Sequence, residues 1–218
     1  MPYVFSALTG IFACVYAFIR RDGKLSNRIF VKTAASLSFV LLVVSLQMRA
    51  SEPYFTLILI GLCFALAGDV LLLFTDRSSA FLAGGAVCFL FTHISYTAAF
   101  VTKAPLSLYD AALFAALLLL AVTVFSLRGV RLKKIKAGAI LYAIVLCAML
   151  ARALSMLLSR QTSETFAIFV AFGGALFAVS DVLLAFEAMG GRHASLVGTI
   201  SAFFYYSGQI LIALSVAL

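Results

Sequence analysis

Residues 54–74 read YFTLILIGLCFALAGDVLLLF, an apolar run that contains one charged residue, Asp69. A membrane-spanning helix needs about 20 predominantly apolar residues, and this run has that length. The same pattern recurs on both sides of it and divides the chain into eight apolar runs with short connections. We therefore predict an all-α membrane protein with eight transmembrane helices in a single polytopic domain over residues 1–218. The predicted helices span residues 2–20, 29–48, 54–74, 80–102, 107–127, 137–158, 165–187 and 195–217.

The composition excludes the soluble classes of protein. Of the 218 residues, 65% are hydrophobic and 11% are charged. A soluble domain is about half apolar and about one quarter charged. A water-soluble enzyme, a secreted domain and a DNA-binding module are therefore excluded. No charge precedes the first apolar run, so we expect it to be a retained first helix and not a signal peptide.

The net charge of +8 is explained by membrane orientation, because the basic residues gather in alternate loops. Lysine and arginine are enriched in the cytoplasmic loops of membrane proteins. The odd-numbered loops are therefore predicted to be cytoplasmic, both termini to be non-cytoplasmic, and nucleic acid not to be a partner. The odd loops carry Arg20, Arg21, Lys24, Arg28, Arg77, Arg128, Arg131, Lys133, Lys134, Lys136 and Arg192, whereas the even loops carry Arg49, Lys103 and Arg160.

The cysteines and histidines do not form a pattern typical of a metal site or a disulfide framework. All four cysteines lie inside apolar runs without close pairing, and the chain has two histidines. Such cysteines are typical small buried residues. We expect no metal and no cofactor. The short loops favour a multi-pass protein of a bacterial inner membrane.

A short motif occurs twice. Residues 68–74 read GDVLLLF and residues 180–186 read SDVLLAF, which match at five of seven positions with an offset of 112 residues. Each aspartate is followed 24 residues later by a polar aromatic residue: His93 after Asp69, and Tyr205 after Asp181. We interpret this as two parallel four-helix repeats; the alternative is chance similarity between two apolar helices.

Few polar residues lie inside the apolar runs, and these are the candidate functional residues. An ionisable group in hydrocarbon costs about 3 kcal/mol on insertion scales, so it usually has a partner and a function. Asp69, Asp181 and Lys32 are predicted to share one depth, in the cytoplasmic third of the membrane. Helical spacing places His93 and Tyr96 on one face, and Tyr205 and Gln209 on another. Tyr142 lies near the cytoplasmic start of its helix. The alternative for each residue is simple interhelical hydrogen bonding.

Other charged residues have simpler interpretations. We expect Arg152 to extend outward from the far end of its helix, towards the headgroups. Asp110 and Glu187 lie close to helix ends, where we expect them to be solvated.

Two carboxylates in a pocket of low dielectric can divide the roles of acid and base. Such a pair suits acid-catalysed hydrolysis through an oxocarbenium ion, and it suits proton-coupled transport almost as well. An intramembrane aspartyl protease also uses two helix-borne aspartates. That class has a Gly-x-Gly-Asp pattern, which is absent because residue 66 is Leu66.

The sequence resembles the YhhN-like lysoplasmalogenase family over nearly its whole length. The resemblance is carried by Ala67–Phe100, which contains the first aspartate motif, His93 and Tyr96, and by Ala175–Ala213, which contains the second motif, Tyr205 and Gln209. Tyr142 and Met149–Ala153 also resemble the sixth helix of that family. One departure concerns Lys32, which is followed by Thr33 where the family commonly has proline.

The resemblance implies a membrane-embedded hydrolase that cleaves the vinyl ether bond of lysoplasmalogen. The products would be a fatty aldehyde and glycerophosphocholine or glycerophosphoethanolamine, and the partners would be a lysophospholipid and the bilayer. A small transporter, a hydrolase of another lysolipid and a purely structural membrane protein are the alternatives; the oligomeric state stays open. The implied catalytic residues are Asp69 and Asp181, and the implied substrate-binding residues are Lys32, His93, Tyr96, Tyr142, Tyr205 and Gln209.

Overall fold

The computed structural model describes residues 2–20, 22–47, 52–127, 137–188 and 194–218. Within these ranges the chain forms eight α-helices and a short terminal 3₁₀ helix, and no strand. An all-α fold is thereby confirmed. The helices are α1 (Pro2–Ile19), α2 (Leu25–Ser45), α3 (Tyr54–Leu72), α4 (Ser79–Lys103), α5 (Leu108–Leu127), α6 (Ala137–Ser159), α7 (Glu164–Ala188) and α8 (Ala194–Leu214), followed by η3 (Ser215–Ala217).

Helix α2 departs most from its predicted bounds. We predicted residues 29–48, whereas the helix runs from Leu25 to Ser45. The apolar run marks the part of a helix that suits hydrocarbon, but a helix can continue by a turn into the polar headgroup region. Arg28 is consequently part of α2, one turn before Lys32 and on the same face.

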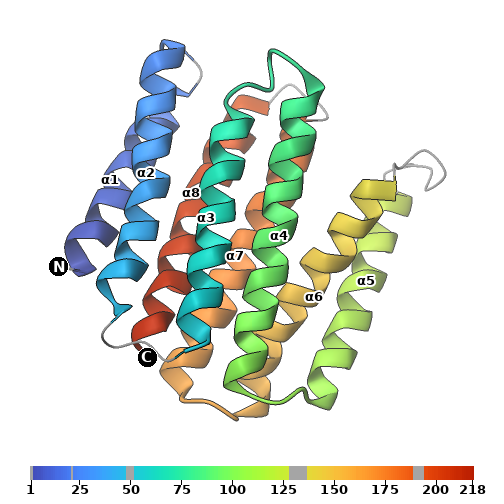
Figure 1. Ribbon diagram of the computed structural model, residues 1–218. Coiled ribbons are helices and arrows are strands. Elements are labelled where there is room, and N and C mark those ends of the chain that lie inside the picture. The colour runs from blue at the N-terminus through green and yellow to red at the C-terminus, as the bar shows by residue number, and fades with distance from the viewer. Residues whose placement is uncertain (1, 21, 48–51, 128–136, 189–193) are drawn as a thin grey trace.

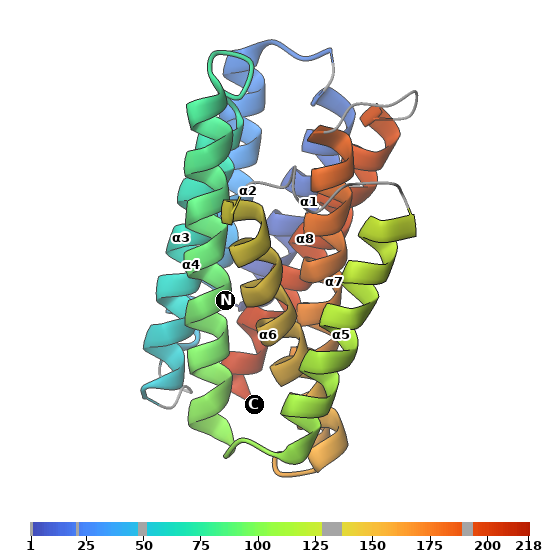
Figure 2. The same cartoon turned by 90° about the vertical axis from the view of Figure 1, so that its right-hand side faces the viewer.

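Consecutive helices run antiparallel, so α1 begins and α8 ends at the same end of the bundle (Figure 1). Contacts join α1, α2, α3, α4, α6, α7 and α8 into a closed ring, since α8 packs against α1. Helix α5 packs on α6 at the edge of the bundle farthest from α1 (Figures 1 and 2). The carboxyl ends of α1, α3, α5 and α7 lie at the end shown at the top of Figure 1, and we call this the odd-loop end.

The apolar surface and the helix lengths are those of a multi-pass membrane protein. Among the described residues, α2, α3, α4, α6, α7 and α8 contain stretches long and apolar enough to cross a membrane. Helices α1 and α5 contribute the shorter apolar stretches Tyr3–Ile19 and Leu108–Val124. Large apolar side chains such as Phe18 and Leu108 point outward, at 86% and 85% exposure. Eight complete spans and the orientation of the termini stay predictions. All the lysines and arginines of the fifth and seventh loops lie outside the described residues.

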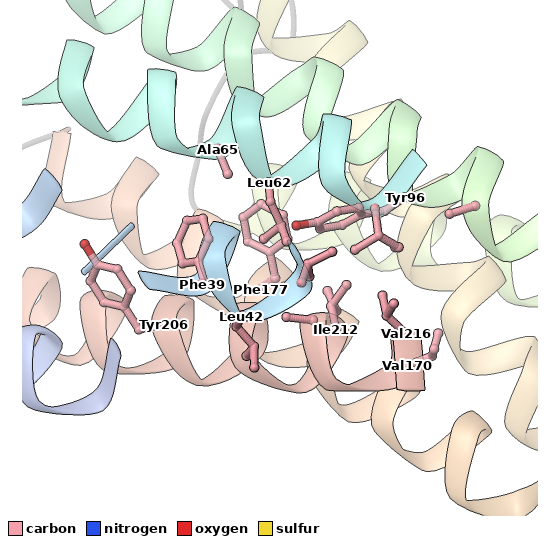
Figure 3. Packing of buried hydrophobic residues seen from close by; sticks show 14 of the residues in the cluster. Phe39, Leu42, Leu62, Ala65, Tyr96, Val170, Phe177, Tyr206, Ile212 and Val216 are labelled. Carbon is pink, nitrogen blue, oxygen red and sulfur yellow. The ribbon is translucent and has the colours of Figure 1, made fainter. Parts of the chain in front are cut away.

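A layer of aromatic and aliphatic side chains fills the middle of the bundle (Figure 3). Phe39 on α2, Leu62 on α3, Tyr96 on α4, Phe177 on α7 and Ile212 on α8 are all fully buried. Figure 3 shows Phe39, Leu62 and Phe177 converging on one another. This layer separates the polar groups near the odd-loop end from the opposite end of the bundle.

Helices α7 and α8 approach closely because glycines face each other. A Cβ on Gly208 would lie 2.8 Å from the carbonyl oxygen of Gly173 and 2.9 Å from the backbone nitrogen of Phe177. Backbone atoms cannot move aside as a side chain can, so this contact requires glycine.

The expectation that Arg152 extends outward was wrong. Its side chain is 2% exposed, and its guanidinium donates to the carbonyl oxygens of Phe100 and Ala104 at the end of α4. It also contacts Asp110 at 3.2 Å, so Asp110 is paired and not merely solvated. The backbone carbonyls that α4 leaves unsatisfied at its carboxyl end provide a nearer set of acceptors than the headgroup region.

Candidate active site

Asp69 lies near the carboxyl end of α3 and binds three side chains, from α2 and α8, through both carboxylate oxygens. Oδ1 lies 3.1 Å from Nζ of Lys32 on α2. Oδ2 accepts hydrogen bonds from Ser36 at 2.5 Å and from Tyr205 on α8 at 2.7 Å. Asp69 is 2% exposed and Lys32 is 8% exposed. A buried carboxylate needs this kind of complete pairing, because an unpaired charge would be very costly there.

Asp181, on α7, has a different set of partners. Its Oδ2 lies 2.7 Å from Nε2 of His93 on α4 and accepts a hydrogen bond from the Tyr142 hydroxyl on α6 at 2.5 Å. In the neutral tautomer that carries hydrogen on Nε2, His93 donates to this carboxylate. Among the described residues, neither a lysine nor an arginine pairs with Asp181, and its Oδ1 has no hydrogen-bond partner. The two carboxylates therefore sit in different electrostatic environments.

The two hydrogen-bond networks cross between the halves of the chain. Asp69 in α1–α4 is bonded by Tyr205, and Asp181 in α5–α8 is bonded by His93. His93 and Tyr205 are the two residues that follow the aspartates by the same interval, but each binds the aspartate of the other half. The packing is reciprocal in the same way: α2 packs against α8, and α6 packs against α4. This reciprocity favours the interpretation of two repeats.

Both aspartates line one small cavity of about 60 Å³, together with Lys32 and Tyr205. The side chain of Phe89 and the carboxyl-terminal turns of α3 and α7 close its sides. The cavity has room for about two water molecules by the usual volume of water. A water or a small reacting group would thus lie between the two carboxylates.

The inner cavity opens into a larger one of about 580 Å³ at the odd-loop end, which we call the vestibule. Arg20, Lys32 and Glu187 line both spaces, so the vestibule leads directly to the aspartates. The vestibule is lined by Tyr16, Arg20, Arg28, Lys32, Leu72, Thr75, Asp76, Leu82, Leu184 and Glu187.

Glu187 is not simply solvated, and that expectation was wrong. Its carboxylate pairs with the Arg20 guanidinium across the mouth of the inner cavity. The pair lies over Gly198 on α8, where a Cβ would collide with both side chains. This contact could not be predicted from the sequence, because the two partners are 167 positions apart in the chain.

Tyr96 and Gln209 form a separate pair in the core layer. The Tyr96 hydroxyl donates to Oε1 of Gln209 at 2.6 Å, and both residues are fully buried. Neither is bonded to an aspartate. Phe177 lies between this pair and the carboxylate networks: its ring packs on His93 with centroids 4.6 Å apart and on Tyr96 with centroids 6.1 Å apart.

The structure thus brings six of the eight predicted site residues into the two carboxylate networks and places Tyr96 and Gln209 one layer deeper. Sequence reasoning missed Ser36, Arg20 and Arg28. Ser36 could have been found, because it lies four residues after Lys32 and therefore on the same helical face. Among the described residues, no group of three His, Cys, Asp or Glu side chains could hold a metal ion.

Comparison with known proteins gives one match. Residues 27–216 match the sequence model of the YhhN family, which covers nearly the whole chain. No curated protein and no solved structure matches the chain. The match begins after α1, so Tyr16 and Arg20 lie outside it, whereas Arg28, Lys32 and both aspartates lie within it.

Proposed function

This chain belongs to the YhhN family, and we propose that it is a membrane-embedded hydrolase that cleaves the vinyl ether bond of a lysoplasmalogen. The observation that carries the proposal is the pair of buried aspartates, from equivalent positions of the two halves, on one small cavity. Family membership supports a lysoplasmalogenase-like activity. The products would be a fatty aldehyde and glycerophosphocholine or glycerophosphoethanolamine.

The different surroundings of the aspartates suggest how they divide the chemistry. Both oxygens of Asp69 are occupied by Lys32, Ser36 and Tyr205, so this carboxylate is held in place as a fixed negative charge. Asp181 is held through Oδ2 alone, which leaves Oδ1 available to carry and transfer a proton. We assign proton transfer to Asp181 and electrostatic stabilisation of the cationic intermediate to Asp69.

The reaction then proceeds in balanced steps. Asp181 donates its proton to the β-carbon of the enol ether, and the electron pair of the double bond forms the new C–H bond. The oxocarbenium ion that results is stabilised by the Asp69 carboxylate. A water molecule adds to the cationic carbon and returns a proton to Asp181. The hemiacetal collapses to the aldehyde when its hydroxyl loses a proton and the glycerol oxygen gains one.

His93 and Tyr142 are positioning residues in this scheme. Both bind Oδ2 of Asp181, and their own separation is 3.2 Å, so they fix the carboxylate from two sides. Lys32 and Tyr205 do the same for Asp69. Tyr96 packs on Phe177, whose ring in turn packs on Phe89 and Tyr205 of the cavity lining, and we propose no direct substrate contact for Tyr96 or Gln209.

The buried layer of Phe39, Leu62, Phe177 and Ile212 favours a hydrolase over a transporter. It fills the bundle on the side of the aspartates away from the vestibule, and a transporter would have to open this layer in the other half of its cycle, whereas a hydrolase entered from the vestibule can keep it closed. The alternative is hydrolysis of another lysolipid, such as one with an acyl chain in place of the alkenyl chain.

Aldehyde release by the purified protein in nanodiscs tests this function. Wild type is incubated with a lysoplasmalogen, beside Asp69→Asn and Asp181→Asn variants whose folding is checked by thermal melting. We expect wild type to release aldehyde and Asp181→Asn to lose it by a factor of about 10²–10⁴, the usual contribution of a positioned proton-transfer group. Asp69→Asn should lose it by a factor of about 10²–10³, the usual contribution of an electrostatic stabiliser. Equal rates in all three proteins would contradict the assignment of the carboxylates. Release of fatty acid from an acyl lysolipid, without aldehyde from the plasmalogen, would identify the alternative substrate.

A further inference from the structure

The vestibule has a cationic wall that the proposed reaction does not use. Arg20 at the end of α1 and Arg28 in the first turn of α2 both line it. We propose that these two arginines bind the phosphate of a glycerophospholipid headgroup and thereby set the depth at which the chain's ether bond lies. This inference rests on the proposed function and deepens it by assigning a headgroup site.

Arg28 provides the stronger evidence for an anion site. Its side chain is partly buried and its Nε is buried without a hydrogen-bond partner. Within the part of the chain that the structure describes, no carboxylate pairs with this guanidinium. A buried donor without an acceptor destabilises the protein, so an anion in the vestibule that accepts from it would relieve that cost. The planar guanidinium matches two phosphate oxygens.

Arg20 is held in a manner that phosphate can replace. Its guanidinium pairs with Glu187 among its contacts, and the two side chains are 16% and 23% exposed. Neither side chain is sealed from the vestibule, so another anion can reach the guanidinium and compete with Glu187 for it. Gly198 leaves the space in which the arginine lies. A phosphate in the vestibule could therefore displace Glu187 and accept the hydrogen bonds that Arg20 now donates to it.

The spacing along α2 matches the length of a lysophospholipid. Arg28 precedes Lys32 by about 6 Å and Ser36 by about 12 Å of helix rise, and both of these residues bind Asp69. In a lysoplasmalogen about six bonds separate phosphorus from the first vinyl carbon, a reach of about 7–8 Å at bond lengths near 1.5 Å. A phosphate on the arginines would place the vinyl ether beside the carboxylates.

The opposite charge in the vestibule indicates the kind of headgroup. Asp76 and Glu187 also line this space. Phosphate alone would leave these carboxylates facing a second anion, whereas an amine next to the phosphate would face them. The site therefore fits the headgroup of a zwitterionic phosphoester.

Binding of a substrate analogue that cannot be hydrolysed tests the headgroup site apart from turnover. A saturated 1-O-alkyl lysophosphoethanolamine and the matching 1-O-alkylglycerol are titrated into wild type, Arg28→Gln and Arg20→Gln in nanodiscs. Arg77→Gln is the matched control, because Arg77 lies at the same end but is exposed, stacks on Phe74 and does not line the vestibule.

We expect Arg28→Gln and Arg20→Gln each to weaken binding of the phospholipid by about tenfold or more, the effect of losing a charge-assisted pair. Binding of the alkylglycerol should be the same in all four proteins, and the control should bind both ligands like wild type. Unchanged phospholipid affinity in the Arg28 and Arg20 variants would overturn the site.

Two further outcomes separate the possibilities. If inorganic phosphate binds wild type and is lost in Arg28→Gln while phospholipid affinity is unchanged, the arginines serve a soluble anion and the headgroup proposal is wrong. If wild type releases no aldehyde but its phospholipid affinity depends on both arginines, the proposed reaction fails and the headgroup site stands.

Discussion

At the scale of the residue, the cost of burying charge made the site predictable. Asp69, Asp181 and Lys32 could be identified because ionisable groups inside apolar runs need partners. The pairing of Lys32 with Asp69 at 3.1 Å agrees with their predicted common depth. Which aromatic residue serves which aspartate could not be predicted, because the hydrogen bonds cross between the halves of the chain. Ser36 could be placed on the face of Lys32 by its spacing, but its bond to Asp69 could not be predicted, since serine in a membrane helix commonly bonds its own backbone.

The ion pair of Lys32 and Asp69 gives a prediction that separates stability from catalysis. Lys32→Met leaves a buried carboxylate without its cation, which we expect to cost about 3–5 kcal/mol and to lower the apparent melting temperature. The double variant Lys32→Met/Asp69→Asn buries no unpaired charge, so it should recover most of that stability. It should stay inactive in the aldehyde assay.

Thermal melting in one detergent, with aldehyde release measured on the same samples, checks this. Recovery of activity together with stability in the double variant would show that Asp69 has only a structural role. A single variant as stable as wild type would contradict the importance of the ion pair.

At the scale of the element, helix bounds followed from apolar runs to within a few residues. The exception, α2, matters for the site, because its earlier start places Arg28 on the same face as Lys32. The burial of Arg152 was not predictable from periodicity, since its acceptors are carbonyl groups at the end of another helix. End-of-helix carbonyls are satisfied by whichever donor the tertiary fold supplies.

The close contact of α7 and α8 gives a prediction with an internal control. Gly208→Ala would press a methyl group against backbone atoms of α7 within 3 Å, and we expect a loss of about 1–3 kcal/mol, typical of overpacking. Gly10→Ala introduces the same methyl group on α1, where nothing lies within 4 Å. It should be neutral or stabilise the helix by up to about 1 kcal/mol.

Melting temperatures of the two variants beside wild type provide the comparison. Equal stability of the two alanine variants would mean that the helices separate at little cost, which is contrary to the packing described. A loss in Gly10→Ala would point to an unrecognised contact on the lipid-facing side of α1.

At the scale of the whole molecule, the fold class and the membrane environment followed from composition alone. The ring of seven helices with α5 outside it did not, because every run is apolar on most sides and the sequence does not specify its neighbours. The positive charges of the odd loops predict that the vestibule opens to the cytoplasm. The structure places the start of α1 and the end of α8 at the end of the bundle opposite the odd-loop end (Figure 1).

This orientation can be tested with fusions at the carboxyl terminus, expressed in a bacterial host. Alkaline phosphatase, which is active only outside the cytoplasm, should be active when fused after Leu218. A green fluorescent protein fused at the same point should be dark. The reverse pattern would place the vestibule on the outer face and would require the headgroup to enter from that side.

The central claim is that the aspartate pair hydrolyses a vinyl ether by protonating carbon, and hydrolysis in heavy water tests it most directly. The purified wild-type protein is incubated with a lysoplasmalogen in D₂O, and the aldehyde is trapped and analysed by mass spectrometry. The account predicts one deuterium on the carbon next to the aldehyde carbonyl, beyond that found in aldehyde simply kept in D₂O, and no product from Asp181→Asn. Aldehyde without this deuterium, or product from Asp181→Asn at the wild-type rate, would contradict it.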